Sequence, residues 1–258
     1  MKRPTIPLML LIAASIFVFF LLNLLLGSVS IPIGSVWNIL WGGTDESVIW
    51  QNIIWKSRVP QALTALVAGA GLSISGLQMQ TVFRNPLAGP SVLGISSGAS
   101  LGVAFVVLLS GAFGGVALSK LGYMGEVALS LAAVIGALSV MALIVYVSQK
   151  VKGNVTLLII GVMIGYVASA VIGVLKYFSV EEDIRAYVIW GLGSFARVSG
   201  DQMTLFVCIM VVLIPLSFLL IKTMNLMLLG DGYARNLGLN IKRARLLVIT
   251  SAGVLTAC

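Results

Sequence analysis

Residues 81–102 read TVFRNPLAGPSVLGISSGASLG and lie between two long apolar runs. The stretch interrupts these runs with an arginine, an asparagine, two prolines and many glycines and serines. Pro86 cannot continue a helix and biases Asn85 away from the α region, whereas Pro90 suits the first turn of a new helix. The pattern therefore predicts that one helix ends at this turn and that another begins after it.

The second of these helices starts with small residues, which are Gly94, Ser96, Ser97, Gly98, Ser100 and Gly102. Small side chains let helix backbones approach closely, and serine hydroxyls can form hydrogen bonds across the interface. We therefore expect the start of this helix to pack against protein rather than against lipid.

The composition places such helices in a membrane. Of the 258 residues, 59% are hydrophobic and 9% are charged, whereas a soluble domain carries about 25% charged residues. The apolar runs have a length of about 20 residues, which suits transmembrane helices and exceeds the strands of a barrel. The predicted fold class is an all-α, polytopic helical membrane protein.

Six complete spans and a partial seventh are expected. They cover residues 7–27, 60–83, 91–109, 125–147, 155–177 and 202–221, and a seventh run starts at Leu246. The first run exceeds the core of a signal peptide, which is about 7–15 residues long, so it is expected to be retained. The seventh run has 13 residues, fewer than the ~20 needed to cross a bilayer. We therefore expect the sequence to be the N-terminal part of a longer chain.

Two segments between the spans are expected to be helical without crossing. Residues 28–46 predict an interfacial helix and loop, with Trp37 and Trp41 at headgroup depth. The segment after the fifth span is polar at both ends and predicts a short helix. With the N-terminus inside, more Lys and Arg fall in inside loops than in outside loops, and every acidic residue except Asp231 falls outside. The distribution predicts a multi-pass protein of the cytoplasmic (inner) membrane with a cytoplasmic N-terminus.

The residue types present limit the chemistry. Histidine is absent, and Cys208 and Cys258 lie in apolar runs without metal-ligand spacing, so no catalytic or metal-binding residue is predicted. An intramembrane enzyme is a remote alternative, because it needs converging nucleophiles, ligands or acid–base pairs. The net charge of +8 follows from the membrane topology, and no nucleic-acid partner is predicted.

The stretch SRVPQALTALVAGAGLSISGLQMQTVFRNPLAGPSVLGISSGASLG closely resembles the signature of the FecCD/BtuC-like permeases. These are the membrane subunits of binding-protein-dependent ABC importers for iron–siderophores, haem and vitamin B12. The matches at the turn are Arg84, Asn85, Pro86, Leu87, Pro90 and Gly94. The chain departs from the family pattern at Gln61, where a second arginine is frequent. IWGLGSFARVS (189–199) and LLGDGYARNLGLNIKRARLL (228–247) resemble family segments as well.

The resemblance implies a BtuC-like type II ABC importer permease. The complete family chain has about ten spans, of which about six and a half would be covered here. Residues 1–258 would then form a single transmembrane permease domain that is incomplete at its C-terminus. The implied partners are two ABC ATPase subunits, a second permease copy or a paralogue, and an extracytoplasmic substrate-binding protein.

The implied function is translocation of an iron(III)–siderophore or similar metal chelate into the cytoplasm. A vitamin B12 or haem importer of the same family is the alternative, because it shares every motif quoted. The chain lacks the phosphate-binding loop G-x-x-x-x-G-K-[ST], so it is expected not to be an enzyme and to bind no cofactor. ATP and Mg would be used by the partner ATPase.

The resemblance also assigns an ATPase-coupling loop to residues 224–245. The residues implied are Gly230, Asp231, Ala234, Arg235, Leu237 and Gly238. Gly230 and Gly238 would flank a short helix, and the apolar residues expected to enter an ATPase groove are Leu228, Leu229, Leu237 and Leu239. The alternative is an interfacial helix that basic residues hold against anionic lipid.

Two further groups of residues have candidate roles. The fifth span carries small residues at intervals of four, which are Gly161, Gly165, Ser169 and Gly173. Helix packing accounts for most of this pattern, and the resemblance adds a lining role in the translocation pathway. On the outside, the residues predicted to dock the binding protein are Arg58, Lys56 and Arg197, although Lys56 is also suited to snorkelling at the headgroups.

Overall fold

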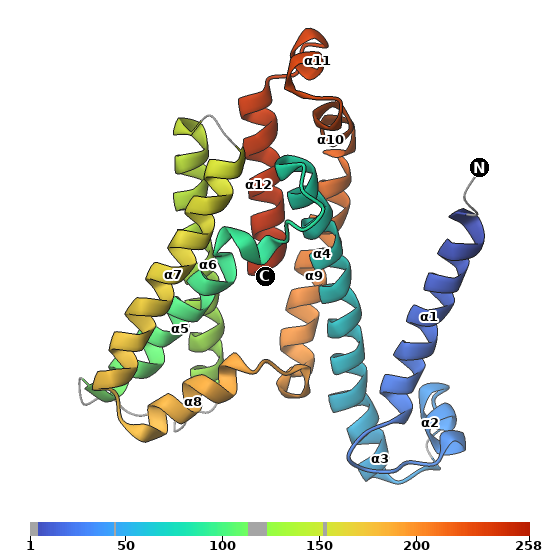
Figure 1. Ribbon diagram of the computed structural model, residues 1–258. Coiled ribbons are helices and arrows are strands. Elements are labelled where there is room, and N and C mark those ends of the chain that lie inside the picture. Colours follow the sequence, from blue (N-terminus) through green and yellow to red (C-terminus); the bar gives the residue numbers. More distant parts are fainter. Residues whose placement is uncertain (1–4, 44, 113–122, 152–153) are drawn as a thin grey trace. The chain divides into compact units, whose positions relative to one another are not determined.

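The computed structural model describes residues 5–43, 45–112, 123–151 and 154–258, and every regular element in these ranges is a helix (Figure 1). The α-helices are α1 (Thr5–Leu25), α2 (Ile33–Leu40), α3 (Val48–Ile53), α4 (Val59–Phe83), α5 (Ile95–Ala112), α6 (Tyr123–Lys150), α7 (Asn154–Phe178), α8 (Glu181–Gly191), α9 (Gly200–Phe218), α10 (Ile221–Leu228), α11 (Asp231–Asn236) and α12 (Ile241–Ala257). A π turn, η1 (Ile54–Arg58), and two 3-10 turns, η2 (Pro90–Leu93) and η4 (Phe195–Arg197), lie between them.

Five helical segments of the described chain are long and apolar enough to cross a membrane. They are Ile6–Leu25, Val48–Phe83, Met124–Lys150, Val155–Phe178 and Gly200–Phe218. The predicted third span corresponds to a shorter apolar helix, Ile95–Leu109. The predicted all-helical, multi-span fold class is therefore confirmed.

The predicted start of the second span is wrong. The helix does not begin at Pro60 but runs without interruption from Val48 through η1 into α4. A proline inside a helix lacks an N–H donor and its ring clashes with the carbonyl of the residue four positions earlier. The wide π turn directly before Pro60 accommodates this proline, so Lys56 and Arg58 lie in a helix rather than in a loop.

The last helix also begins earlier than predicted, at Ile241 rather than at Leu246. The Asn240 side chain accepts a hydrogen bond from the backbone N–H of Arg243 at 3.2 Å, which is the geometry of a stabilising N-cap. The basic residues that follow Asn240 consequently belong to the first turns of α12.

The chain divides into two compact units. The first comprises Met1–Gly69 and Ser194–Ile209, and the second Ala70–Gly193 and Met210–Cys258. In the first unit, α2 buries Val36 and Ile39 against Ile31 and Ile54. Trp37 of α2 and Trp41 directly after it are exposed, which is compatible with the position at headgroup depth predicted for them.

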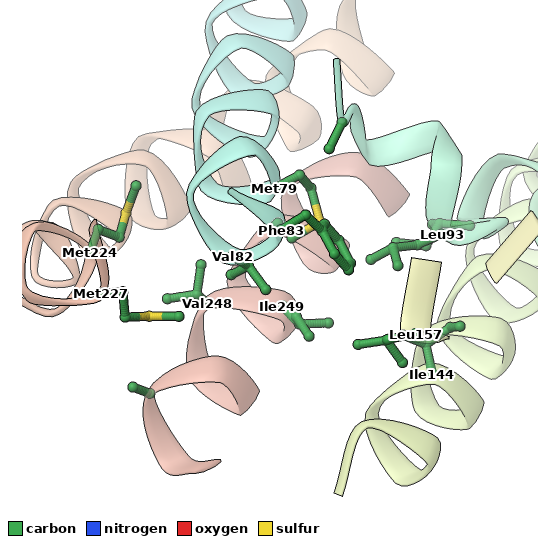
Figure 2. Packing of buried hydrophobic residues seen from close by; sticks show 14 of the residues in the cluster. Met79, Val82, Phe83, Leu93, Ile144, Leu157, Met224, Met227, Val248 and Ile249 are labelled. Atoms are coloured by element: carbon green, nitrogen blue, oxygen red, sulfur yellow. The ribbon is translucent and has the colours of Figure 1, made fainter. Parts of the chain in front are cut away.

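The second unit has a core to which seven elements contribute, α4, η2, α5, α6, α7, α10 and α12. Figure 2 labels ten of its side chains: Met79, Val82, Phe83, Leu93, Ile144, Leu157, Met224, Met227, Val248 and Ile249. The end of α4 and two methionines of α10 therefore pack in one apolar cluster. Within this unit, α8 and α11 lie at opposite ends of the long helices (Figure 1).

Glycine allows α5 to pack closely against its neighbours, as the sequence predicts. A Cβ on Gly98 would lie 2.6 Å from the carbonyl oxygen of Gly136 in α6, and a Cβ on Gly161 in α7 would lie 2.7 Å from that of Val92 in η2. Both distances are too short for any side chain. Gly94 has a φ of +73°, a left-handed conformation that glycine adopts without steric cost, and it joins η2 to α5.

Candidate coupling surface and translocation cavity

The turn between α4 and α5 has the tight geometry that the sequence predicts. Arg84 ends α4 with a φ of +48° and is the only non-glycine residue of the described chain with a positive φ. The Asn85 side-chain oxygen accepts a hydrogen bond from the N–H of Leu87 at 2.9 Å. The Asn85 carbonyl accepts one from the N–H of Ala88 at 3.0 Å. Leu87 is exposed, whereas Ala88 is buried in the core of the second unit.

The predicted coupling loop, residues 224–245, is not one loop. Its first part belongs to α10, where Met224 and Met227 are buried in the core of the second unit. Its last part is the start of α12. The exposed segment between them is α11 with its flanking residues, and the expectation that all of 224–245 forms a loop is corrected accordingly.

Glycines define both ends of α11. Gly230 precedes the helix with a φ of +105° and Gly238 follows it with a φ of +84°. The N–H of Leu239 donates to the Ala234 carbonyl, and the N–H of Gly238 donates to the Arg235 carbonyl, each at 2.9 Å. This pair of bonds is the Schellman motif, which satisfies the last carbonyls of a helix. The predicted short helix flanked by Gly230 and Gly238 is thus present.

An apolar surface is exposed on α11 and beside it. Leu228, Leu229, Tyr233 and Leu237 have exposed side chains, and we refer to these four residues as the α11 surface. Ala234 is fully buried and fixes the opposite side of the helix. Leu239 packs against the core. It is therefore not exposed to a partner in the way predicted from the sequence for the four leucines. A group of large apolar side chains in solvent is typical of an interaction site.

Three charged side chains meet at the start of α11. The guanidinium of Arg84 donates to the Asp231 carboxylate and, at 3.1 Å, to the Met227 carbonyl. Arg245 of α12 lies 3.9 Å from the second carboxylate oxygen of Asp231. From the sequence, Arg84 is predicted only as part of the turn, and its contact with Asp231 is not predicted. The signal available was that Asp231 is the single acid assigned to the inside.

A polar cavity of about 390 Å³ lies between α5, α7 and α8. Its lining includes Ser96, Ser97 and Ser100 of α5, Ser169 and Gly173 of α7, and Tyr187 of α8. The ammonium group of Lys176 also lines the cavity and lies 4.8 Å from the centre of the Tyr187 ring, which is a cation–π contact. The cavity therefore presents hydroxyl groups and one ammonium group, and most of its lining side chains are small.

The small residues of α7 divide between two roles. Gly161 is buried against η2, and Gly165 lies close to the Ser97 hydroxyl, so this half of the stripe serves packing. Ser169 and Gly173 are exposed and line the cavity. A second hollow of about 240 Å³ borders Gly161, Gly165 and Ser169. The arrangement is compatible with both readings of the sequence, and the pathway role of these residues stays a prediction.

Helix α8, which is not one of the spanning segments, contributes Tyr187 to the lining of the cavity, and burial affects the titration of two of its side chains. Burial raises the pKa of Asp183, and the neighbouring Glu182 raises it further. Burial also raises the pKa of Tyr187, although a hydrogen bond with Ser100 opposes this shift. Within the described chain, no three His, Cys, Asp or Glu residues gather into a metal site.

The residues predicted to dock a binding protein lie in the first unit, where η1 and η4 are in contact. Lys56 is exposed, but Arg58 is only 4% exposed. Its guanidinium donates to the carbonyls of Leu24 at 2.7 Å, Leu25 at 2.9 Å and Val29. The expectation that Arg58 is available at the surface is therefore corrected: it binds the end of α1. The side chain of Arg197 lies outside the described part of the chain.

Comparison with known proteins agrees with this geometry. A model of the FecCD transport family matches residues 15–258. The vitamin B12 import system permease protein BtuC of Serratia proteamaculans (strain 568) is 34% identical over 225 residues, which are 87% of this chain and 63% of that protein. The hemin transport system permease protein HmuU of Yersinia pestis is 32% identical over 233 residues, which are 89% and 66% of the two chains.

The solved structures include a similar protein, described as an inward-facing conformation of a metal-chelate type ABC transporter. It has a TM-score of 0.76 and 28% sequence identity, and the match covers 98% of this chain and 74% of the other. The present chain spans slightly less than two thirds of the length of the two curated relatives. A family match over nearly the whole chain, together with a shared all-helical fold, leads to one assignment: this integral membrane protein belongs to the FecCD transport family.

Proposed function

We propose that the chain is the permease subunit of a binding-protein-dependent ABC importer. The observation that carries this proposal is the α11 surface, a group of large exposed apolar side chains on and beside a short helix that lies between two glycines of positive φ. An exposed apolar helix of this kind fits a groove on another protein. In a permease of this family, the protein that supplies the groove is the ATPase.

The proposed assembly has two permease copies or paralogues, two ATPase subunits and an extracytoplasmic binding protein. The ATPase subunits bind ATP and Mg, and their movement reaches the permease through α11. The permease lies in the cytoplasmic (inner) membrane with its N-terminus in the cytoplasm. In this orientation, Arg84 and Asp231, which are in contact, both lie on the cytoplasmic side.

The proposed solute is a large metal chelate, and an iron(III)–siderophore is the first candidate. Haem and vitamin B12 are the second, because the curated relatives described above are named for hemin and vitamin B12. The cavity beside α7 is compatible with a polar solute, since four serines, one lysine and Tyr187 line it together with Gly173 and Ile172. Specificity among these chelates would reside mainly in the binding protein.

The decisive experiment is reconstitution of the full-length protein with its co-purifying partners in proteoliposomes. We expect uptake of one ferric siderophore, hemin or cyanocobalamin that requires both ATP and the binding protein. Leu237→Glu should reduce uptake at least tenfold by placing a charge on the α11 surface, whereas Leu192→Glu, at an exposed position of the predicted outside, should not. Uptake in vesicles that contain no ATPase would refute the proposal.

A further inference from the structure

The end of α4 and the start of α11 are joined by one arginine, although 147 positions separate the two bonded residues. Arg84 donates to the Asp231 carboxylate, and the same guanidinium nitrogen donates to the Met227 carbonyl at 3.1 Å. Met227 lies in the last turn of α10, and its carbonyl also accepts a hydrogen bond from the backbone N–H of Gly230 at 3.3 Å. One side chain directly after α4 therefore contacts the junction between α10 and α11.

Arg245 connects the same carboxylate to α12. Its side chain is 11% exposed, and its terminal nitrogen lies 3.9 Å from the second oxygen of Asp231. The Arg245 Nε atom is buried without a hydrogen-bond partner in the described chain. A largely buried guanidinium needs a nearby anion, because an unpaired charge is costly away from water. Asp231 is the acid that meets this need.

We propose that Arg84, Asp231 and Arg245 form an ionic clamp that sets the position of α11 relative to α4 and α12. We refer to these three residues as the Asp231 clamp. Arg84 is then a positioning residue: it need not touch an ATPase, but it fixes the helix that does. This consequence rests on the proposed function, whereas the clamp itself does not.

The backbone at Arg84 supports a dedicated role for its side chain. The residue adopts a φ of +48°, a left-handed conformation that is unfavourable for a residue with a Cβ and free of strain for glycine. Glycine at this position would make the turn without strain but could not form the clamp. Arg84→Gly consequently removes the guanidinium and leaves the required turn intact.

The clamp is tested first in the full-length permease without any ATPase, by hydrogen exchange. We expect the amides of residues 234–239 to exchange several-fold faster in Arg84→Gly and in Asp231→Asn than in the wild type. Arg84→Lys should give an intermediate rate, since lysine keeps the charge but lacks the fork of donors. Lys222→Gln, which removes an exposed charge from α10, should leave the rate unchanged.

A second measurement covers the possibility that a variant does not fold. In the wild type, raising the salt concentration from about 0.05 M to about 1 M screens exposed charges, and the two partners of the Arg84–Asp231 pair are 41% and 39% exposed. Exchange at 234–239 should then accelerate relative to exchange at residues 248–252 in the core of α12. Equal exchange in Arg84→Gly and wild type, or no response to salt, would overturn the clamp.

The role in coupling is tested in the reconstituted complex by the amount of solute imported per ATP hydrolysed. Arg84→Gly and Asp231→Asn should lower this ratio at least fivefold. Unchanged ratios alongside faster exchange would overturn the positioning role and leave the clamp standing. If no ATPase binds the wild-type permease, the proposed function fails and the exchange result remains valid.

Discussion

Arg58 shows how burial gives a charged side chain a structural role. Helix α1 ends at Leu25, and the carbonyls of its last turn have no partners within the helix. The Arg58 guanidinium satisfies two of these carbonyls by donating to Leu24 and Leu25, and it also donates to the carbonyl of Val29. A Cβ on Gly27 would lie 2.9 Å from the same guanidinium. The chain can pass this close to Arg58 because Gly27 has no side chain.

Arg58→Gln is expected to destabilise the full-length protein by about 3 kcal/mol, since hydrogen bonds to charged groups contribute roughly 1.5–3 kcal/mol and unpaired buried acceptors add a further cost. Arg58→Lys should recover only part, because an ammonium group cannot present the same fork of donors. Thermal unfolding in detergent measures the effect, with exposed Lys56→Gln as the control. Equal melting temperatures for Arg58→Gln and Lys56→Gln would contradict this role.

The raised pKa of Asp183 predicts that its contribution to folding stability falls as the pH rises, which is the reverse of the usual behaviour of a carboxyl group. Its pKa is raised above the ordinary value of 3.8, so the folded protein binds this proton more tightly than the unfolded chain does. Stability contributed by this group is therefore lost as the pH rises from 3.8 through the raised folded pKa. Asp183→Asn should raise the melting temperature at neutral pH and remove this loss.

The measurement is the melting temperature of wild type and Asp183→Asn as a function of pH. Glu181→Gln is the control, because Glu181 lies on the same helix with an exposed side chain. The melting temperatures of wild type and Asp183→Asn should diverge as the pH rises. A wild type that gains stability relative to Asp183→Asn over this window would show that the sign is wrong.

At the scale of elements, the crossing of α5 and α6 depends on missing side chains. Gly98→Ala would place a Cβ 2.6 Å from a backbone oxygen of α6, so the helices must separate. Strain of this type costs about 1–3 kcal/mol. Gly76→Ala in α4 is the matched control, because a Cβ there meets no atom within 4 Å and alanine favours helix.

Melting temperature and the fraction of monodisperse protein in size-exclusion chromatography would measure this effect. Gly98→Ala should lower both, and Gly76→Ala should leave them unchanged or raise them. Equal behaviour of the two variants would show that α5 and α6 are not held at the distance described.

Elements with a local cause were predictable from the sequence, and contacts with a distant cause were not. The turn after α4 could be predicted because Asn85 and Pro86 determine it by their own backbone preferences. The ends of α11 could be predicted because Gly230 and Gly238 are local signals. The burial of Arg58 could not, since its acceptors lie 29 to 34 positions earlier in the chain, and a sequence pattern does not reveal such distances.

At the scale of the whole molecule, the cavity beside α7 should be reached by solvent if it belongs to the transport route. In a variant with Cys208→Ser and Cys258→Ser, Gly173→Cys should react with a polar thiol reagent, because Gly173 is exposed and lines the cavity. Ala168→Cys is the control, since Ala168 is 2% exposed. The difference in labelling rate should be at least tenfold.

The complete transporter adds a second criterion to this labelling experiment. Under the proposed function, labelling of Gly173→Cys from outside should change when ATP is hydrolysed, because the route opens to alternate sides. Complete protection of Gly173→Cys in every state of the complex would show that this cavity is not part of the route.

The π turn at Ile54–Arg58 has a consequence for chain length. A π turn accommodates one more residue than an α-helical turn, and an α-helix advances by about 100° per residue around its axis. Deleting a single amino acid within 54–58 could restore an ordinary α-helical turn and still leave an unbroken rod. Every residue before the deletion would then be rotated about the axis relative to α4, and the end of α1 would no longer face the Arg58 guanidinium that holds it. This short segment should therefore be far less tolerant of insertions and deletions than its regular appearance suggests.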